Sequence, residues 1–296
     1  MTNDKYVDIL SGLPYLDKVI CIKRKKFLGR LRVLKDLIKQ DYLIFTDWQP
    51  QLLFAGWLFG VKNRMGIPKL GHSLNKKMTK QLTVKVLDYT QYAAKTNAML
   101  FEEALDIDLM PDAWQCDVGQ PKKENVARVD ALLNEIGLNQ DTAFVLLTPF
   151  AGLEQRNWPK EEAEKLVSLV KTQYGLPVLV LGPGEKRDES AGISPYNLVG
   201  RTDVLDMVEF IRRAKLLITP DSGPMHIAGA LGTKVVALFS KDLPSRWAPR
   251  KLCQAITLNM KCSPCNDETA QKCKTVACMR NITAEMVMEA IAKLSL

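Results

Sequence analysis

Apolar residues along the chain follow two alternating spacings, and each spacing predicts a different element. Short aliphatic and β-branched runs bounded by turn residues are typical of strands, whereas apolar positions three and four residues apart are typical of helices. Runs of the first kind cover residues 18–22, 42–45, 143–147, 178–181, 216–219 and 235–239. Helical spacing covers residues 31–38, 52–59 (as a buried helix), 86–105, 126–136, 160–174, 204–213, 225–231 and 283–294. Strands that alternate with helices favour an α/β protein whose parallel sheets are covered by helices on both faces.

The alternation fades between residues 106 and 122, where acidic residues, Pro and Gly interrupt the apolar pattern. We interpret this stretch as a linker between two domains, residues 1–120 and 121–296, for which the chain is long enough. Hydrophobic residues make up 47% and charged residues 25%, a balance that excludes an intrinsically disordered chain. The longest apolar run, residues 52–61, is too short to span a bilayer, and the N-terminus has no secretory signal. We therefore expect a cytoplasmic protein.

Positive charge is concentrated in the first third of the chain. Residues 1–100 hold 18 Lys and Arg against 7 Asp and Glu, whereas the remaining 23 basic and 26 acidic residues nearly cancel. Two basic clusters stand out, residues 23–26 and residues 76–80. Such a field attracts phosphates, nucleic acid or an anionic membrane surface, although a solubilising face is the simpler interpretation of either cluster. Nucleic acid is disfavoured because no known binding motif accompanies the charge.

Residues 216–228 predict a buried strand, a tight turn and a helix that begins at once. Asp221 or Ser222 can cap this helix, Gly223 lets the backbone approach a ligand, and Pro224 suits the first helical turn. Because a helix N-terminus after a parallel strand offers backbone N–H groups to anions, a phosphate or pyrophosphate is the natural ligand. The alternative is an ordinary capped turn that binds nothing.

The amino-acid sequence of this stretch is more specific than its pattern of strand, turn and helix. Residues 221–239 closely resemble the signature of glycosyltransferase family 9, the ADP-heptose:lipopolysaccharide heptosyltransferases and their relatives. Further segments that resemble the family in order and spacing are residues 148–159, 246–249 and 262–283. The resemblance covers essentially the whole chain and is specific from Val145 onward.

The resemblance implies a GT-B architecture, in which two Rossmann-like domains with parallel sheets face each other across a cleft. The C-terminal domain would bind an ADP-sugar, and heptose or a related sugar would pass with inversion to a lipopolysaccharide core acceptor. It implies that catalysis requires no metal or other cofactor, and that the partners are the donor and the acceptor but not nucleic acid. The basic first third would then recognise an acidic acceptor, with peripheral attachment to the inner face of the inner membrane.

Family likeness also implies roles for particular residues. Those expected around the sugar and diphosphate of the donor are Asp221, Ser222, Gly223, Met225 and His226. Arg156 stands where the family has a phosphate-binding Lys, and Gly152, like Ala151, replaces a residue that often carries a hydroxyl, so backbone N–H groups would have to substitute. Glu185 is a candidate for the ribose. Simpler interpretations are a surface cation for Arg156 and packing for His226; we expect packing or structural roles for His72, Trp158 and Trp247.

One family element is missing from the sequence. The family opens with a strand and a glycine-rich turn carrying Gly-Asp, whose Asp is taken as the general base, but this chain contains no Gly-Asp pair. Residues 3–20 instead resemble the segment that comes after the family's first strand–helix unit, which suggests that this unit is absent. Asp47 is a weak substitute, so the catalytic base is unassigned. The alternative function is therefore a non-catalytic nucleotide-sugar-binding homologue.

Four cysteines, Cys262, Cys265, Cys273 and Cys278, cluster near the C-terminus. Their spacing is compatible with tetrahedral zinc, which a reducing compartment favours over a disulfide. The second pair is more widely spaced than in zinc ribbons, so reduced thiols or a disulfide remain the alternatives.

Overall fold

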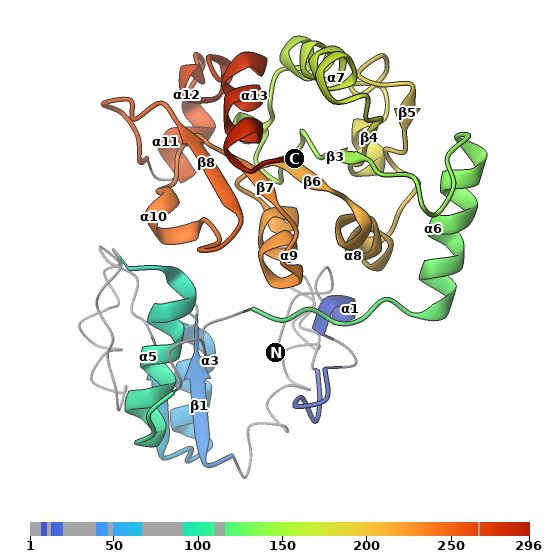
Figure 1. Cartoon of the computed structure of the whole chain (residues 1–296). Coiled ribbons are helices and arrows are strands. Elements are labelled where there is room, and N and C mark those ends of the chain that lie inside the picture. The colour runs from blue at the N-terminus through green and yellow to red at the C-terminus, as the bar shows by residue number, and fades with distance from the viewer. Residues whose placement is uncertain are drawn as a thin grey trace. The chain divides into compact units, whose positions relative to one another are not determined.

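The computed structural model of the protein describes residues 7–10, 13–19, 40–46, 50–66, 91–109, 116–265 and 267–296. By its internal contacts the chain divides into two compact units, residues 1–115 and residues 116–296. Figure 1 labels the elements of both units. None of the helices in the described ranges is both long and apolar enough to cross a membrane.

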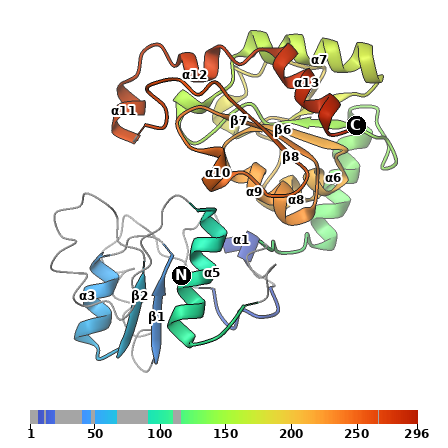
Figure 2. The same cartoon turned by 60° about the vertical axis from the view of Figure 1, so that its left-hand side comes forward.

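The N-terminal unit contains a small parallel sheet between two helices. Strands β1 (Tyr42–Phe45) and β2 (Asn63–Gly66) pair in parallel and are joined through α3 (Pro50–Leu58), while α5 (Ala93–Leu105) follows later in the chain. Figure 2 shows both strands with the two helices beside them. Because side chains alternate along a strand, Phe45 faces α3 and packs on Leu53, whereas Ile44 packs with residues of α5. A short helix, α1 (Val7–Leu10), lies in the same unit.

These elements test the predictions for the first third of the chain. The strand at residues 42–45 is confirmed, and the long helix ends before Asp106 as predicted, with Asp106 in the left-handed conformation. The helix at residues 52–59 is confirmed, but its prediction as buried is wrong in part, because Phe54, Trp57 and Leu58 are exposed. Among the described residues, α3 packs on one side against the sheet of β1 and β2, which cannot cover the whole helix. The predicted helix at 31–38 and most of the strand at 18–22 lie outside the described residues.

The C-terminal unit is built on a six-stranded parallel sheet. Its order is β5-β4-β3-β6-β7-β8, and every neighbouring pair runs in parallel. The strands are β3 (Val145–Leu147), β4 (Val178–Val180), β5 (Tyr196–Asn197), β6 (Leu216–Pro220), β7 (Val235–Phe239) and β8 (Cys253–Thr257). Strand order reverses between β3 and β6, the arrangement of doubly wound nucleotide-binding sheets, which bind ligands at such a reversal.

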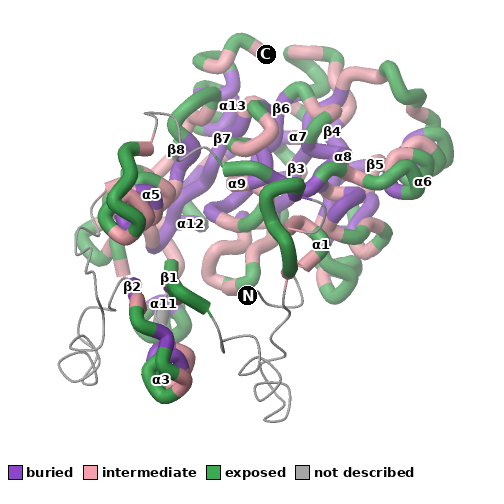
Figure 3. Tube along the Cα trace, turned by 90° about the horizontal axis from the view of Figure 1, so that it is seen from below, coloured by how far each residue is buried: buried purple, intermediate pink, exposed green. Residues whose placement is uncertain are grey.

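Helices cover both faces of this sheet (Figure 1). One face packs against α7 (Lys160–Tyr174) and α13 (Ala284–Lys293), and the other against α9 (Gly223–Leu231) with α8 (Val204–Arg213) beside it. Outside α8 lies α6 (Lys123–Glu135). Strands β3, β4, β6 and β7 are buried along their whole length, which explains their continuous apolar sequences. Figure 3 shows the buried strands within a shell of partly exposed helices.

Helices α7 and α8 and strand β7 match the predicted ranges to the residue. The pattern missed β8 because this edge strand is only half-buried and has no continuous apolar run, and it missed β5 because that strand has two residues. Shorter elements were also missed: η3 (Glu154–Arg156), η4 (Gly184–Lys186), α10 (Pro244–Trp247), α11 (Asp267–Lys272) and α12 (Ala277–Arg280).

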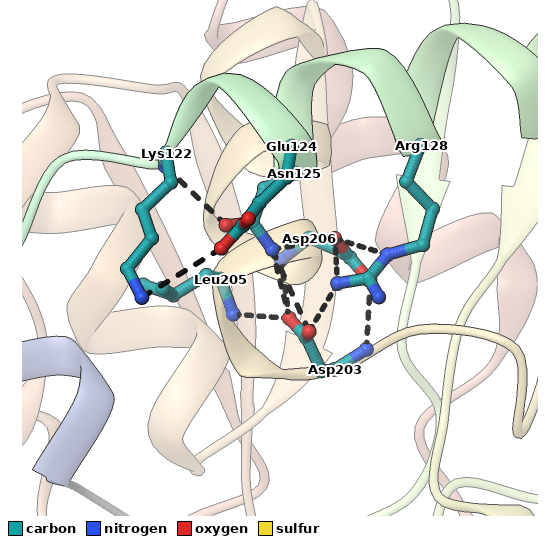
Figure 4. A network of polar contacts seen from close by, with 7 residues as sticks. All are labelled: Lys122, Glu124, Asn125, Arg128, Asp203, Leu205 and Asp206. Carbon is teal, nitrogen blue, oxygen red and sulfur yellow. Dashed lines mark hydrogen bonds and ion pairs between the residues drawn. The ribbon is translucent and has the colours of Figure 1, made fainter.

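A buried carboxylate joins α6 to α8 (Figure 4). The Asp206 side chain is 1% exposed and accepts hydrogen bonds from Asn125 (2.9 Å) and from Nη2 of Arg128 (2.8 Å). Its second oxygen accepts from the backbone N–H of Asp203 (2.9 Å), whose own side chain caps α8 by accepting from Leu205 and Asp206. Because each oxygen of the buried carboxylate has a donor, the network stabilises the contact between the two helices.

Arg128→Ala should lower the free energy of unfolding by about 1–3 kcal/mol, because it removes the charged partner of the buried Asp206 carboxylate. Urea denaturation measures this loss. Lys165→Ala is the matched control, since its ion pair with Glu285 is half-exposed on both sides and should contribute less than the contacts of Arg128. Equal losses in the two variants would contradict a special role for the Asp206 network.

Candidate functional site

The carboxyl ends of three adjacent strands, β3, β6 and β7, bring distant loops together. The loop after β3 contains η3 with Arg156, the turn after β6 carries Asp221 and begins α9, and the turn after β7 carries Lys241 and Asp242. All three strands are parallel, so their ends share one edge of the sheet. This edge includes the reversal between β3 and β6, where ligands bind in sheets of this kind.

Four of these side chains form what we call the charged cluster: Arg156, Asp221, Lys241 and Asp242. Nη1 of Arg156 donates to the backbone carbonyl of Asp221 at 2.8 Å and lies 3.5 Å from its Oδ2. Nη2 of Arg156 lies 2.5 Å from Oδ2 of Asp242. Nζ of Lys241 lies 3.0 Å from the same Oδ2. Two cations and two carboxylates therefore meet in a largely buried place, and Arg156 is not a solvated surface cation.

Burial changes the acid–base properties of Asp221. Loss of solvent, reinforced by the neighbouring Asp242 carboxylate, raises the pKa of Asp221 from 3.8 to about 6, although Arg156 and Lys241 act in the opposite direction. Burial also lowers the pKa of His226, which favours the neutral imidazole. The His226 ring meets Trp247 edge to face with centroids 6.2 Å apart, and the Arg246 guanidinium lies 5.0 Å from the Trp247 ring centroid. The His226 ring therefore packs against Trp247, and its role in donor binding stays a prediction.

Helix α9 begins at this edge without a side-chain cap. Ser222 occupies the N-cap position, but its hydroxyl interacts with Pro220 and Thr219 and makes no cap hydrogen bond. The Asp221 carboxylate turns to Arg156, so neither candidate caps the helix through its side chain. Gly223 is exposed, and a Cβ added there would meet nothing within 4 Å. The first turn of α9 therefore presents the positive end of the helix dipole to this edge, as an anion site requires.

Two buried polar atoms at this edge have no hydrogen-bond partner among the described residues. They are Oγ1 of Thr148, which directly follows β3, and Nε of Arg156. Buried polar groups are normally satisfied, and exceptions occur at functional sites. Both atoms belong to the loop that the family resemblance relates to phosphate binding.

The other predicted donor residues lie in different surroundings. Gly152 is exposed with room for a side chain, whereas the backbone N–H of Ala151 donates to Asn157 at 2.8 Å and is used within its own loop. Glu185 is exposed in η4, after the neighbouring strand β4. The Met225 side chain is fully buried, which favours packing.

The packing role expected for Trp158 agrees with the structure, because this side chain is buried and its indole N–H donates to the carbonyl of Ile282. Asp47, His72 and both basic clusters lie outside the described residues.

Sequence reasoning missed Lys241 and Asp242. A signal was present, since these charged residues follow the buried strand β7 after a single serine, as Asp221 follows β6. Charged residues at the carboxyl end of a parallel strand belong to the ligand-binding edge.

The four clustered cysteines line one cavity of about 60 Å³, together with Gln155, Lys241 and neighbouring residues. All four are free thiols. Burial raises the pKa of Cys265 and Cys278, whereas a hydrogen bond from the Val276 N–H lowers that of Cys273. Within the described ranges, no three His, Cys, Asp or Glu side chains are arranged to hold a metal ion. Zinc binding by the four thiols stays a prediction, which metal analysis of the purified protein would test.

The sheet order defines a doubly wound α/β protein with a charged cluster at the reversal, and comparison with known proteins identifies the family. The family model described as glycosyltransferase family 9 (heptosyltransferase) matches residues 30–275. The lipopolysaccharide core heptosyltransferase OpsX of Haemophilus influenzae is 21% identical over 257 residues, 81% of this chain and 69% of that protein. Lipooligosaccharide heptosyltransferase 2 of Campylobacter jejuni is 30% identical over 130 residues, 40% of this chain and 41% of that protein.

Solved structures agree in fold. The glycosyl transferase family 9 protein of Veillonella parvula has a TM-score of 0.80 at 17% identity, covering 99% of this chain and 86% of that chain. The heptosyltransferase WaaC of Escherichia coli, solved with ADP, has a TM-score of 0.67 at 13% identity, covering 99% of this chain and 88% of that chain. A second structure of WaaC holds ADP-2-deoxy-2-fluoro heptose.

The chain belongs to glycosyltransferase family 9, the heptosyltransferase family, and is thus a member of a transferase family. The expected α/β GT-B fold class is confirmed by a six-stranded parallel sheet, a second, smaller parallel sheet and these structural relatives.

Asp221 gives the stability of the fold a pH dependence of known sign. Its pKa is higher in the folded chain, so the folded state holds this proton more tightly than the unfolded state between pH 3.8 and about 6. The stability that the protonated group contributes is therefore present below this window and is lost as the pH rises through about 6. At about 1.4 kcal/mol per pKa unit, the full loss is about 3 kcal/mol.

Asp221→Asn removes the titrating group and should remove this loss. From about pH 4 to about pH 7, the free energy of unfolding should change in favour of the variant relative to the wild type. Urea denaturation at several pH values measures the difference. A difference that stays constant over this range would show that the pKa of Asp221 is not raised.

Proposed function

We propose that this protein transfers heptose, or a related sugar, from an ADP-sugar to a lipopolysaccharide core acceptor, with inversion at the anomeric carbon. Membership of family 9 supports the class of reaction. Support for the donor comes from relatives of the same fold that hold ADP and an ADP-heptose analogue, and support for the acceptor comes from the named activity of the H. influenzae relative. The observation that carries the proposal for this chain is the charged cluster beside the start of α9.

In this proposal the donor diphosphate lies against the carboxyl ends of β3 and β6. Arg156 supplies positive charge from the loop after β3, and the first turn of α9 supplies the helix dipole. Ser222, Gly223 and His226 would surround the sugar and the diphosphate, and Glu185 in η4 would contact the ribose. A diphosphate suits this site because it carries negative charge on two linked groups and can reach both sources of positive charge.

Chemistry then proceeds by direct displacement. An acceptor hydroxyl oxygen attacks the anomeric carbon while the bond from that carbon to the diphosphate oxygen breaks, and ADP leaves with the bonding electrons. Negative charge grows on the leaving diphosphate, so the preorganised guanidinium of Arg156 and the N–H groups of α9 stabilise the transition state more than the ground state. The hydroxyl proton must pass to a base, a role that no described residue is assigned.

The acceptor is proposed to meet the N-terminal unit. Its excess of 18 basic over 7 acidic residues in positions 1–100 would attract the phosphates and acidic sugars of a core oligosaccharide. The same charge would favour peripheral binding at the inner face of the inner membrane, where such an acceptor is anchored.

A second function is favoured by one observation, the lack of any Gly-Asp pair to supply the family base. The chain would then bind the nucleotide sugar without transferring it. Incubation with ADP-heptose and a deacylated heptose-deficient core, followed by mass spectrometry, separates the two. A mass gain of one heptose on the acceptor supports transfer, binding of ADP-heptose without transfer supports the second function, and absence of binding contradicts both.

Arg156→Ala should weaken binding of ADP-heptose by about tenfold to a hundredfold, because it removes a cation that contacts Asp221 directly before the start of α9. Isothermal titration calorimetry measures the affinity. Arg201→Ala is the matched control: it removes an Arg from the same unit whose ion pair, with Glu135 of α6, is exposed, and it should leave the affinity unchanged. Equal affinities of Arg156→Ala and the wild type would refute the assignment.

A further inference from the structure

We propose that Lys241 is a second phosphate-binding cation of this site, and that Asp242 is the positioning residue that holds it beside Arg156. The inference rests on the proposed function in one respect, namely that the anion is the diphosphate of a nucleotide sugar. Neither residue belongs to the family signature quoted from the sequence, and neither was expected at the site.

Geometry places the two cations within reach of one diphosphate. Nη2 of Arg156 and Nζ of Lys241 both lie within 3.0 Å of a single oxygen, Oδ2 of Asp242. The two nitrogens are therefore less than about 6 Å apart, as that shared contact requires. Asp242 fixes this separation, because Lys241 also lies 3.1 Å from its Oδ1 and cannot swing away without losing both contacts.

The two cations come from loops that follow the strands on either side of β6, the strand that leads into the helix start. Arg156 follows β3 and Lys241 follows β7, while Asp221 and α9 follow β6, which lies between those two strands. A diphosphate at the start of α9 would thus meet one cation from each neighbouring strand. One phosphate can contact Arg156 while the other contacts Lys241.

The Lys241 side chain is buried, which is unusual for a lysine. The residue is 7% exposed, whereas lysines are almost never buried unless they are paired, since burying an ammonium group is costly. Within the charged cluster two cations face two carboxylates, so protonation of Asp221 leaves one net positive charge that favours a further anion. Asp221, the other carboxylate, is partly protonated near pH 6 because burial raises its pKa.

Lys241 also contacts the cysteine cavity, which offers a competing explanation for its burial. It lines the cavity of the four cysteines, its backbone carbonyl accepts from the N–H of Cys265 at 3.0 Å, and its charge lowers the pKa of that thiol. Lys241 could therefore serve the thiols alone. The two roles differ in their readout, because only the proposed role affects the binding of phosphates.

The test measures binding of inorganic pyrophosphate and of ADP by calorimetry. Lys241→Met keeps the length of the side chain and removes its charge, and should weaken binding of both ligands by about tenfold or more. Lys241→Arg keeps the charge and should stay within about threefold of the wild type. Lys234→Met is the matched control: Lys234 directly precedes the same strand β7 at its opposite end, where its ammonium donates to the carbonyl of Ser295, and its loss should change neither affinity.

The positioning role of Asp242 is tested by a double-mutant cycle on pyrophosphate binding. If Asp242 holds Lys241 in place, Lys241→Met should cost less in the Asp242→Asn background than in the wild type, because an amide no longer anchors both cations. Additive effects would overturn this role. Near-ultraviolet circular dichroism of each variant shows whether it is folded; if Lys241→Met does not fold, Lys241→Gln replaces it in the cycle.

The outcomes separate this inference from the proposed function. If Lys241→Met binds pyrophosphate and ADP as the wild type does, or changes only the reactivity of the thiols with Ellman's reagent, the inference is overturned while the proposed function stands. If the wild type binds pyrophosphate through Lys241 but gains no affinity from an ADP-sugar, the proposed donor is wrong while Lys241 remains a phosphate-binding residue. A wild type that binds neither pyrophosphate nor ADP overturns both.

Discussion

The site depends on one constraint, that all six strands of the C-terminal sheet run in the same direction. Parallel strands end at a common edge, so the residue that follows each strand is delivered to the same place whatever its distance along the chain. Arg156 and Asp242 are 86 residues apart and meet at 2.5 Å for this reason. Helix α9 starts between them because β6 lies between β3 and β7. An antiparallel edge would scatter these groups to opposite ends of the sheet.

Two groups of buried charges in the same unit illustrate different uses of the same chemistry. Each oxygen of Asp206 accepts hydrogen bonds from α6 or from the capped start of α8. This network therefore holds two helices together, and both carboxylate oxygens are satisfied within the protein. In the charged cluster, one carboxylate serves two cations, and the Nε of Arg156 has no partner in the described part of the chain. Charge that is shared or unsatisfied in the protein is available to a ligand. This difference separates the structural network around Asp206 from the proposed donor site.

The donor side of the proposed reaction lies in the C-terminal unit, and the acceptor side is proposed to lie in the N-terminal unit. On the donor side, the family signature, the sheet reversal and the charged cluster all point to one edge of one sheet. In the N-terminal unit the described residues form a two-stranded parallel sheet between α3 and α5, with small cores on each face. The exposed aromatic side chains Phe54 and Trp57 of α3 are a consequence of that small sheet, which packs only one side of the helix. In the proposed reaction the cations of the charged cluster serve the leaving group, and no described residue is assigned as the general base.

The sequence by itself determined the alternation of strands and helices, with α7, α8 and β7 correct to the residue, because buried parallel strands and amphipathic helices each carry a local pattern. It also singled out Asp221 and Arg156, because both lie in sequence motifs that resemble those of the family. Edge strand β8 escaped because its half-buried residues lack that pattern. Only the tertiary structure decided that Lys241 and Asp242 join Arg156, and that Ser222 leaves the start of α9 uncapped. Strand order is set by packing between distant segments, and no local pattern records which loops will become neighbours.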